Sequence, residues 1–119
     1  NYKGRKLHPI SEAEKVFYDN NLNIKKTSKT LNSKETKGEM IGLFKLSSNG
    51  SKIFKHYYEI AKKKYKGKKF YSAEIFDKAY ITDFINYLND NKIKIKAVLV
   101  SGGWMEIDTI EDLKRAEKF

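Results

Sequence analysis

Residues 98–116, VLVSGGWMEIDTIEDLKRA, are the most informative stretch of the chain. They combine an apolar run, a glycine pair, one tryptophan, two alternating carboxylates and a threonine three residues before an aspartate. The apolar run is typical of a buried strand, and Thr109 with Asp112 forms the capping pattern that opens a helix. Because ligands of open α/β sheets bind at the carboxyl ends of strands, we expect Glu106 and Asp108 at the mouth of a sheet.

The segments before this stretch predict strands first and helices later. Alternation of apolar residues around turn formers predicts strands, and apolar residues at three- and four-residue spacing predict helices. The order indicates an α/β fold, with α+β as the alternative, built as a mixed sheet with packed helices. The predicted elements are a hairpin over 13–28 with its turn at 19–21, a strand over 38–46, a helix after the turn residues 48–51, a helix over about 79–90, a strand over 93–100 and a last helix over 109–119.

The bulk composition is that of a small globular chain. Its 119 residues provide room for one domain or for half of a larger one, and sixteen aromatic residues are enough for a core. It has no cysteine, so we expect a reducing compartment, the cytoplasm. No apolar run reaches membrane-spanning length and no signal peptide is visible, so we expect no membrane partner. Since the chain begins with Asn1 rather than Met, we expect it to be a piece or a processed product.

The net charge of +10 comes from 23 lysines and only two arginines. Specific readout of phosphates and bases favours the planar guanidinium of arginine. We therefore attribute the excess mainly to compositional drift and do not expect nucleic acid as a partner, although a basic surface attracts any polyanion. Residues 80–119 carry six basic and seven acidic side chains, so the carboxylates gather near Glu106 and Asp108.

Glu106 and Asp108 are the first candidates for chemistry. In an extended segment, side chains two residues apart point to the same face. Mg²⁺ binds one or two such carboxylates together with substrate phosphates. The alternative is a strand end with two solvated acids, one of which helps to cap the next helix.

Four further residues are weaker candidates. Trp104, after a glycine pair, is either a core residue or a wall that stacks on a ligand. Gly38 and Glu39 begin an apolar run, where Glu39 is either an edge carboxylate or a substrate ligand. Lys29 is one of many lysines, and a solvated side chain is its simplest interpretation. No P-loop or other glycine-rich nucleotide loop follows a strand.

Two stretches resemble a known family. GEMIGLFKLS at 38–47, followed by Asn49-Gly50, and GWMEIDTIEDLKRA at 103–116 are similar to the second half of small nucleotidyltransferases. The nearest resemblance is to modules associated with phosphoenolpyruvate mutases in phosphonate biosynthesis, followed by phosphocholine cytidylyltransferases. The lead-in Tyr2-x-Gly-Arg5 and the segment from Ala13 to Lys29 fit the same layout, so the resemblance spans nearly the whole chain.

The resemblance implies roles for the candidates. Asp108 would ligate Mg²⁺ together with an aspartate from the first half of the domain, and Glu106 would flank that site. Lys29 would lie near the acceptor phosphate, and Gly38 and Glu39 would line the acceptor pocket. The family's N-terminal half, with its nucleotide loop, has no counterpart here. Residues 1–119 would then be one piece, the acceptor-side C-terminal half of a Rossmann-like nucleotidyltransferase fold.

The resemblance thus implies part of an enzyme that transfers a nucleotidyl group, with CTP the expected donor, to a phosphonate or phosphomonoester and releases pyrophosphate. We expect the fragment alone to be inactive, and a homo-oligomer is left open. The competing hypothesis is a small basic domain that binds polyanions or nucleic acid without catalysis. Steep salt dependence of binding would distinguish it from the enzyme.

Overall fold

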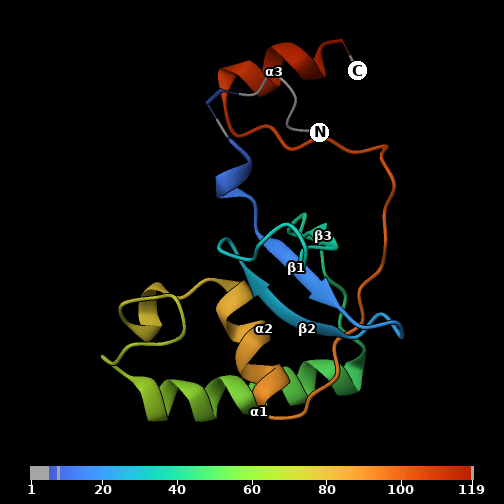
Figure 1. The fold of residues 1–119 in the computed structure, drawn as a ribbon. Helices are drawn as coiled ribbons and strands as arrows, with labels where there is room; N and C mark the ends of the chain where they lie inside the picture. Colours follow the sequence, from blue (N-terminus) through green and yellow to red (C-terminus); the bar gives the residue numbers. More distant parts are fainter. Residues whose placement is uncertain (1–5, 8, 119) are drawn as a thin grey trace.

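The computed structural model describes residues 6–7 and 9–118 of the chain (Figure 1). The lead-in Tyr2-x-Gly-Arg5 lies outside the described residues. In chain order the elements are the 3-10 helix η1 (Ile10–Glu12), strands β1 (Lys15–Tyr18), β2 (Ile24–Ser28) and β3 (Gly38–Glu39), helix α1 (Ser48–Tyr65), the 3-10 helix η2 (Phe76–Lys78), helix α2 (Ile81–Asp90) and helix α3 (Ile110–Ala116).

The predicted hairpin is confirmed. β1 and β2 pair antiparallel, with Val16 opposite Thr27. The turn is organised by Asp19, whose carboxylate accepts hydrogen bonds from the backbone N–H of Asn21 and Asn23 at 2.9 and 2.8 Å and from the Asn23 side chain. These donors, the Asn23 side chain first, hold the pKa of Asp19 well below its ordinary value. Local hydrogen bonds therefore fix this turn, as its Asp-Asn composition indicates.

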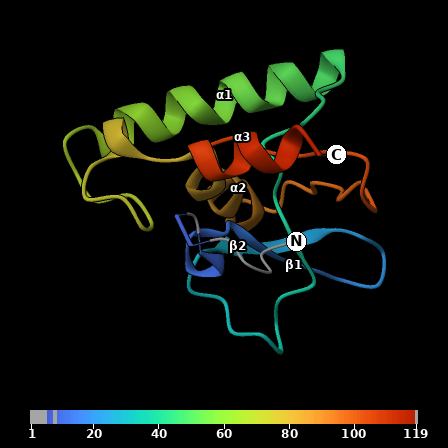
Figure 2. The same ribbon diagram turned by 90° about the horizontal axis from the view of Figure 1, so that it is seen from above.

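The sheet is antiparallel rather than mixed. Its three strands lie in the order β2-β1-β3, and both neighbours of β1 run antiparallel to it. Helix α2 packs on β2, and α1 lies beyond α2, so the order of layers is sheet, α2, α1 (Figures 1 and 2). The α/β class is confirmed, but the predicted mixed sheet is wrong: both pairs among the described strands are antiparallel, and residues 93–100 form no strand and contribute only one antiparallel bridge.

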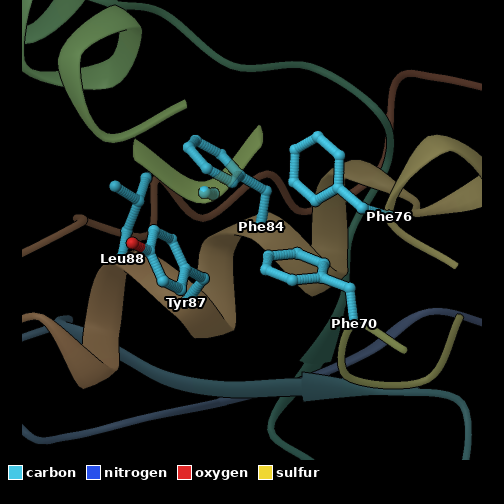
Figure 3. Close-up of a cluster of buried hydrophobic side chains, with 6 residues drawn as sticks. Phe70, Phe76, Phe84, Tyr87 and Leu88 are labelled. Atoms are coloured by element: carbon cyan, nitrogen blue, oxygen red, sulfur yellow. The ribbon is translucent and has the colours of Figure 1, made fainter. Parts of the chain in front are cut away.

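The core lies between α1, α2 and the loop that joins them. Its buried members are Ala61, Phe70, Phe76, Phe84, Tyr87 and Leu88. The rings of Phe70 and Phe76 meet edge to face, with centroids 4.9 Å apart, whereas those of Phe84 and Tyr87 stack (Figure 3). Edge-to-face pairs add to the free energy gained by burying the rings. The aromatic content noted in the sequence is therefore used chiefly here.

The predicted helices are confirmed with shifted ends. α1 starts at Ser48 because the Ser47 hydroxyl accepts a hydrogen bond from the backbone N–H of Gly50 at 3.0 Å. α2 starts at Ile81, two residues later than predicted, where the Asp83 carboxylate accepts from the backbone N–H of Tyr80 at 3.0 Å. The Thr109–Asp112 capping box is present, and α3 follows it.

Two predicted buried strands are wrong. Only Gly38 and Glu39 of the run 38–46 belong to a strand, and residues 93–100 contribute a single bridge, between Asn23 and Lys96. Large side chains in both runs are exposed, among them Leu43 at 79% and Val98 at 86%. The apolar pattern is present, but the described chain covers only part of it: Ile93 and Ile95 pack against the core, whereas Val98 is left exposed. None of the described helices has the length and hydrophobicity needed to cross a bilayer.

Candidate functional site

Glu106 and Asp108 lie on the long connection between α2 and α3. This segment has no helix or strand and runs along one side of the molecule before it reaches α3 (Figure 1). Both side chains are exposed. The described residues contain no group of three or more histidine, cysteine or acidic side chains able to hold a metal ion. The described residues therefore do not form a complete magnesium site, which would need further oxygen ligands beside Glu106 and Asp108.

The glycine pair before Trp104 shapes the same connection. Gly102 and Gly103 adopt φ values of 85° and 73°, a left-handed conformation that glycine tolerates without strain. A Cβ at either position would meet nothing within 4 Å, so close approach of another backbone does not explain these glycines here. Trp104 is half-buried. The Trp104 side chain is therefore neither fully buried in the core nor fully exposed as a surface on which a ligand could stack.

Lys29 lies just after β2 and is anchored rather than freely solvated. Its Nζ donates to Glu12 Oε2 at 3.0 Å and lies 5.8 Å from the centre of the Tyr80 ring. The hydrogen bond to Glu12 raises the pKa of Lys29. The Glu12 carboxylate therefore stabilises the charged ammonium group and orients it. In this structure its charge is partly balanced by the carboxylate.

Gly38 and Glu39 form β3 and border an apolar hollow. Both are half-buried, and the hollow has a volume of about 470 Å³. Its walls come from residues 38–47 and 93–99 and from side chains of β1, α1 and α2, including Ile53, Phe54 and Ile85. Gly38 and Glu39 thus lie at the border of a hollow that is lined mainly by apolar side chains.

Sequence reasoning missed this hollow. Its two main walls are the runs 38–46 and 93–100 that were assigned to buried strands. The signal was present as two near-continuous apolar stretches, but the pattern could not tell whether they would pair with each other or remain apart.

The fold and the site define an α/β protein in which an antiparallel sheet and two helices border an apolar hollow, with two carboxylates on an exposed connection. The chain is 29% identical, over 110 residues, to the CTP:phosphoglutamine cytidylyltransferase of Campylobacter jejuni subsp. jejuni. The match covers 92% of this chain, and the chain spans 42% of the length of that curated relative. No family model matches the chain, and no solved structure matches it. The similarity supports a relationship to cytidylyltransferases.

Proposed function

We propose that residues 1–119 are the acceptor-side part of a cytidylyltransferase that joins a CMP group to a phosphonate or phosphomonoester. The observation that carries this proposal is the similarity to a cytidylyltransferase over 92% of the chain. The relative's name specifies CTP and phosphoglutamine, so its acceptor is a phosphorylated molecule. The Rossmann-like fold and the association with phosphonate chemistry belong to the same proposal and rest on the motifs of the sequence.

The reaction is a displacement at phosphorus. An acceptor oxygen attacks the α-phosphorus of CTP, a new P–O bond forms, and the bond to the β-phosphate oxygen breaks to release pyrophosphate. Mg²⁺, when bound, supplies positive charge that offsets the charge of the triphosphate. Asp108, with Glu106 beside it, would hold one side of that ion.

The other role proposed for this chain is to position the acceptor. Lys29, held in place by its hydrogen bond to Glu12, would attract the acceptor's phosphoryl group. Gly38 and Glu39, at the edge of the hollow, would orient the rest of the acceptor. Such catalysis needs no nucleophile from the protein, since alignment of the two substrates provides much of the rate.

Asp108→Asn tests the proposal in the longer enzyme that carries this segment. We expect CTP-dependent pyrophosphate release to fall by at least about a hundredfold, since the amide is neutral and a poor ligand for Mg²⁺. Asp77→Asn, at an exposed aspartate of η2, is the matched control and should retain activity within about twofold. Full activity of Asp108→Asn would refute the assignment. Robust turnover by the 119-residue chain alone would show that the nucleotide site is misplaced.

A second candidate, a polyanion-binding domain without catalysis, is favoured by one observation. Six lysines gather at the carboxyl end of α1 and in the loop after it, and all six are exposed. Their exposure leaves them accessible to a polyphosphate backbone. Binding that falls steeply with salt and is unaffected by Asp108→Asn would favour this candidate. The lysines are Lys62, Lys63, Lys64, Lys66, Lys68 and Lys69.

A further inference from the structure

A side chain attaches the main chain at Lys29 to the sheet. Strand β2 ends at Ser28, which pairs with Lys15 of β1, so the carbonyl of Lys29 lies beyond the last residue pair of these two strands. Lys15 Nζ donates a hydrogen bond to this carbonyl at 2.7 Å, and Lys15 is half-buried. Because the donor is an ammonium group, this bond is stronger than one between two neutral groups. Lys15 thus continues, through its side chain, the attachment of β2 to β1.

The Lys15 side chain starts from the face of the sheet opposite to α2. Thr27 faces α2, since its Oγ1 donates to the carbonyl of Thr82 at 2.8 Å. Side chains alternate between faces along a strand and paired residues share a face, so Lys15, opposite the residue after Thr27, points away from α2. The Lys29 ammonium lies on the α2 side, 5.8 Å from the centre of the Tyr80 ring. Lys15 therefore holds the main chain of Lys29 without occupying the space around its ammonium group.

Lys29 is consequently fixed at both ends. Its main chain is held by Lys15 and by a local turn, in which the Ser28 hydroxyl accepts from the backbone N–H of Thr30 at 3.1 Å. Its ammonium group donates to Glu12 Oε2 at 3.0 Å. An ammonium group has three N–H donors, so this bond leaves the group able to donate to an anion as well. A flexible lysine loses side-chain freedom when it binds an anion, whereas a lysine that the fold already holds loses less.

We propose that Lys15 is a positioning residue of the acceptor site: by holding the Lys29 carbonyl, it fixes the place where the Lys29 ammonium meets the acceptor's phosphoryl group. This inference rests on the proposed function, which gives Lys29 that role. Lys15 acts through Lys29 and does not touch the acceptor. Without the Lys15 ammonium, the main chain beyond β2 loses its attachment to β1, and binding of the acceptor has to order it again.

The first test is an NMR comparison of variants of the 119-residue chain. The parent should show nuclear Overhauser cross-peaks between the ε-methylene protons of Lys29 and the Tyr80 ring. Lys15→Met keeps an aliphatic side chain but removes the donor, so these cross-peaks should disappear. Lys15→Arg, which still donates, and Lys26→Met, which removes the same charge from an exposed site in β2, should both keep them. Cross-peaks that are absent from the parent, or unchanged in Lys15→Met, overturn the inference.

The second test measures the binding of methylphosphonate, a small phosphonate, through the amide shifts of residues 28–30. At about 0.15 M salt, screening weakens general attraction to the basic surface. The dissociation constant should rise at least about threefold in Lys15→Met, because the anion must then also order the main chain at Lys29. Lys15→Arg should restore the parent value, and Lys26→Met should stay within about 1.5-fold of it. Equal constants in Lys15→Met and Lys26→Met would contradict the inference.

Lys29→Ala separates this inference from the proposed function. It should weaken binding, and adding Lys15→Met to it should weaken binding no further, because Lys15 acts only through Lys29. A further loss in the double variant would mean that Lys15 contacts the anion itself, which also overturns the inference. If the parent and Lys29→Ala bind equally while the cross-peaks change as expected, the acceptor role that the proposed function gives to Lys29 is refuted, and the attachment of Lys29 by Lys15 is upheld.

Discussion

Two regions of this chain have equally apolar sequences, but one is buried in the folded protein and the other is largely exposed. Between residues 48 and 90, α1, α2 and their connecting loop bury Phe70, Phe84 and Tyr87 in one cluster. From 97 to 109 the chain runs as a largely exposed connection to α3 (Figure 1). An apolar sequence pattern therefore indicates that a segment is suited to burial. Whether the segment is buried depends on another part of the protein lying close enough to pack against it.

Phe70→Ala should have the largest effect on stability. The Phe70 side chain is 1% exposed, so its loss leaves a cavity in the aromatic cluster. We expect the free energy of unfolding to fall by about 3–5 kcal/mol in chemical denaturation. Phe44→Ala, at a phenylalanine that is 59% exposed in the run 38–46, is the matched control and should cost less than about 1 kcal/mol. Equal losses would mean that the two regions are equally buried in solution.

Asn86→Ala should have an intermediate effect. The Asn86 side chain accepts from the backbone N–H of Thr27 at 2.9 Å and donates to its carbonyl at 2.8 Å, which joins α2 to β2. Its removal should cost about 1–3 kcal/mol, since the backbone of a buried residue loses both partners. In Asn89→Ala the deleted Nδ2 has no hydrogen-bond partner among the described residues, so the loss should be below about 0.5 kcal/mol. A larger loss of stability in Asn89→Ala than in Asn86→Ala would contradict the role given to the hydrogen bonds between Asn86 and Thr27.

The smallest effect on stability is expected for the contact between α3 and residues 6–7. The Glu111 carboxylate accepts from the backbone N–H of Leu7 and Lys6 at 3.0 and 2.9 Å, and these donors lower the pKa of Glu111. The contact should therefore be complete above the unfolded pKa of about 4.3 and lost as pH falls through the lower folded value. NMR shifts of the Lys6 and Leu7 amides should report a midpoint below about 4.3.

Glu111→Gln is the control for this titration. The amide oxygen still accepts hydrogen bonds but does not titrate in this range, so the acid transition of the Lys6 and Leu7 shifts should disappear. A midpoint above the ordinary glutamate value, or one that persists in Glu111→Gln, would show that another group controls the attachment of α3.

Elements with local signals could be predicted from the sequence. The 19–21 turn, the serine cap of α1 and the Thr109–Asp112 box each act through contacts between residues no more than four positions apart. The sequence did not reveal the Glu12 partner of Lys29, because that ion pair joins residues seventeen positions apart. The site roles of Lys29, Gly38, Glu39, Trp104, Glu106 and Asp108 all stay predictions.

Residue type and spacing were enough to specify the helices and the hairpin and to show that the runs 38–46 and 93–100 are suited to burial. The antiparallel sheet, the gathering of the aromatic residues between α1 and α2, and the hollow that the two apolar runs border all depend on tertiary packing. The physical reason is that a helix or tight turn satisfies its backbone within a few residues, whereas a strand satisfies its backbone only through a neighbour that the chain must bring to it.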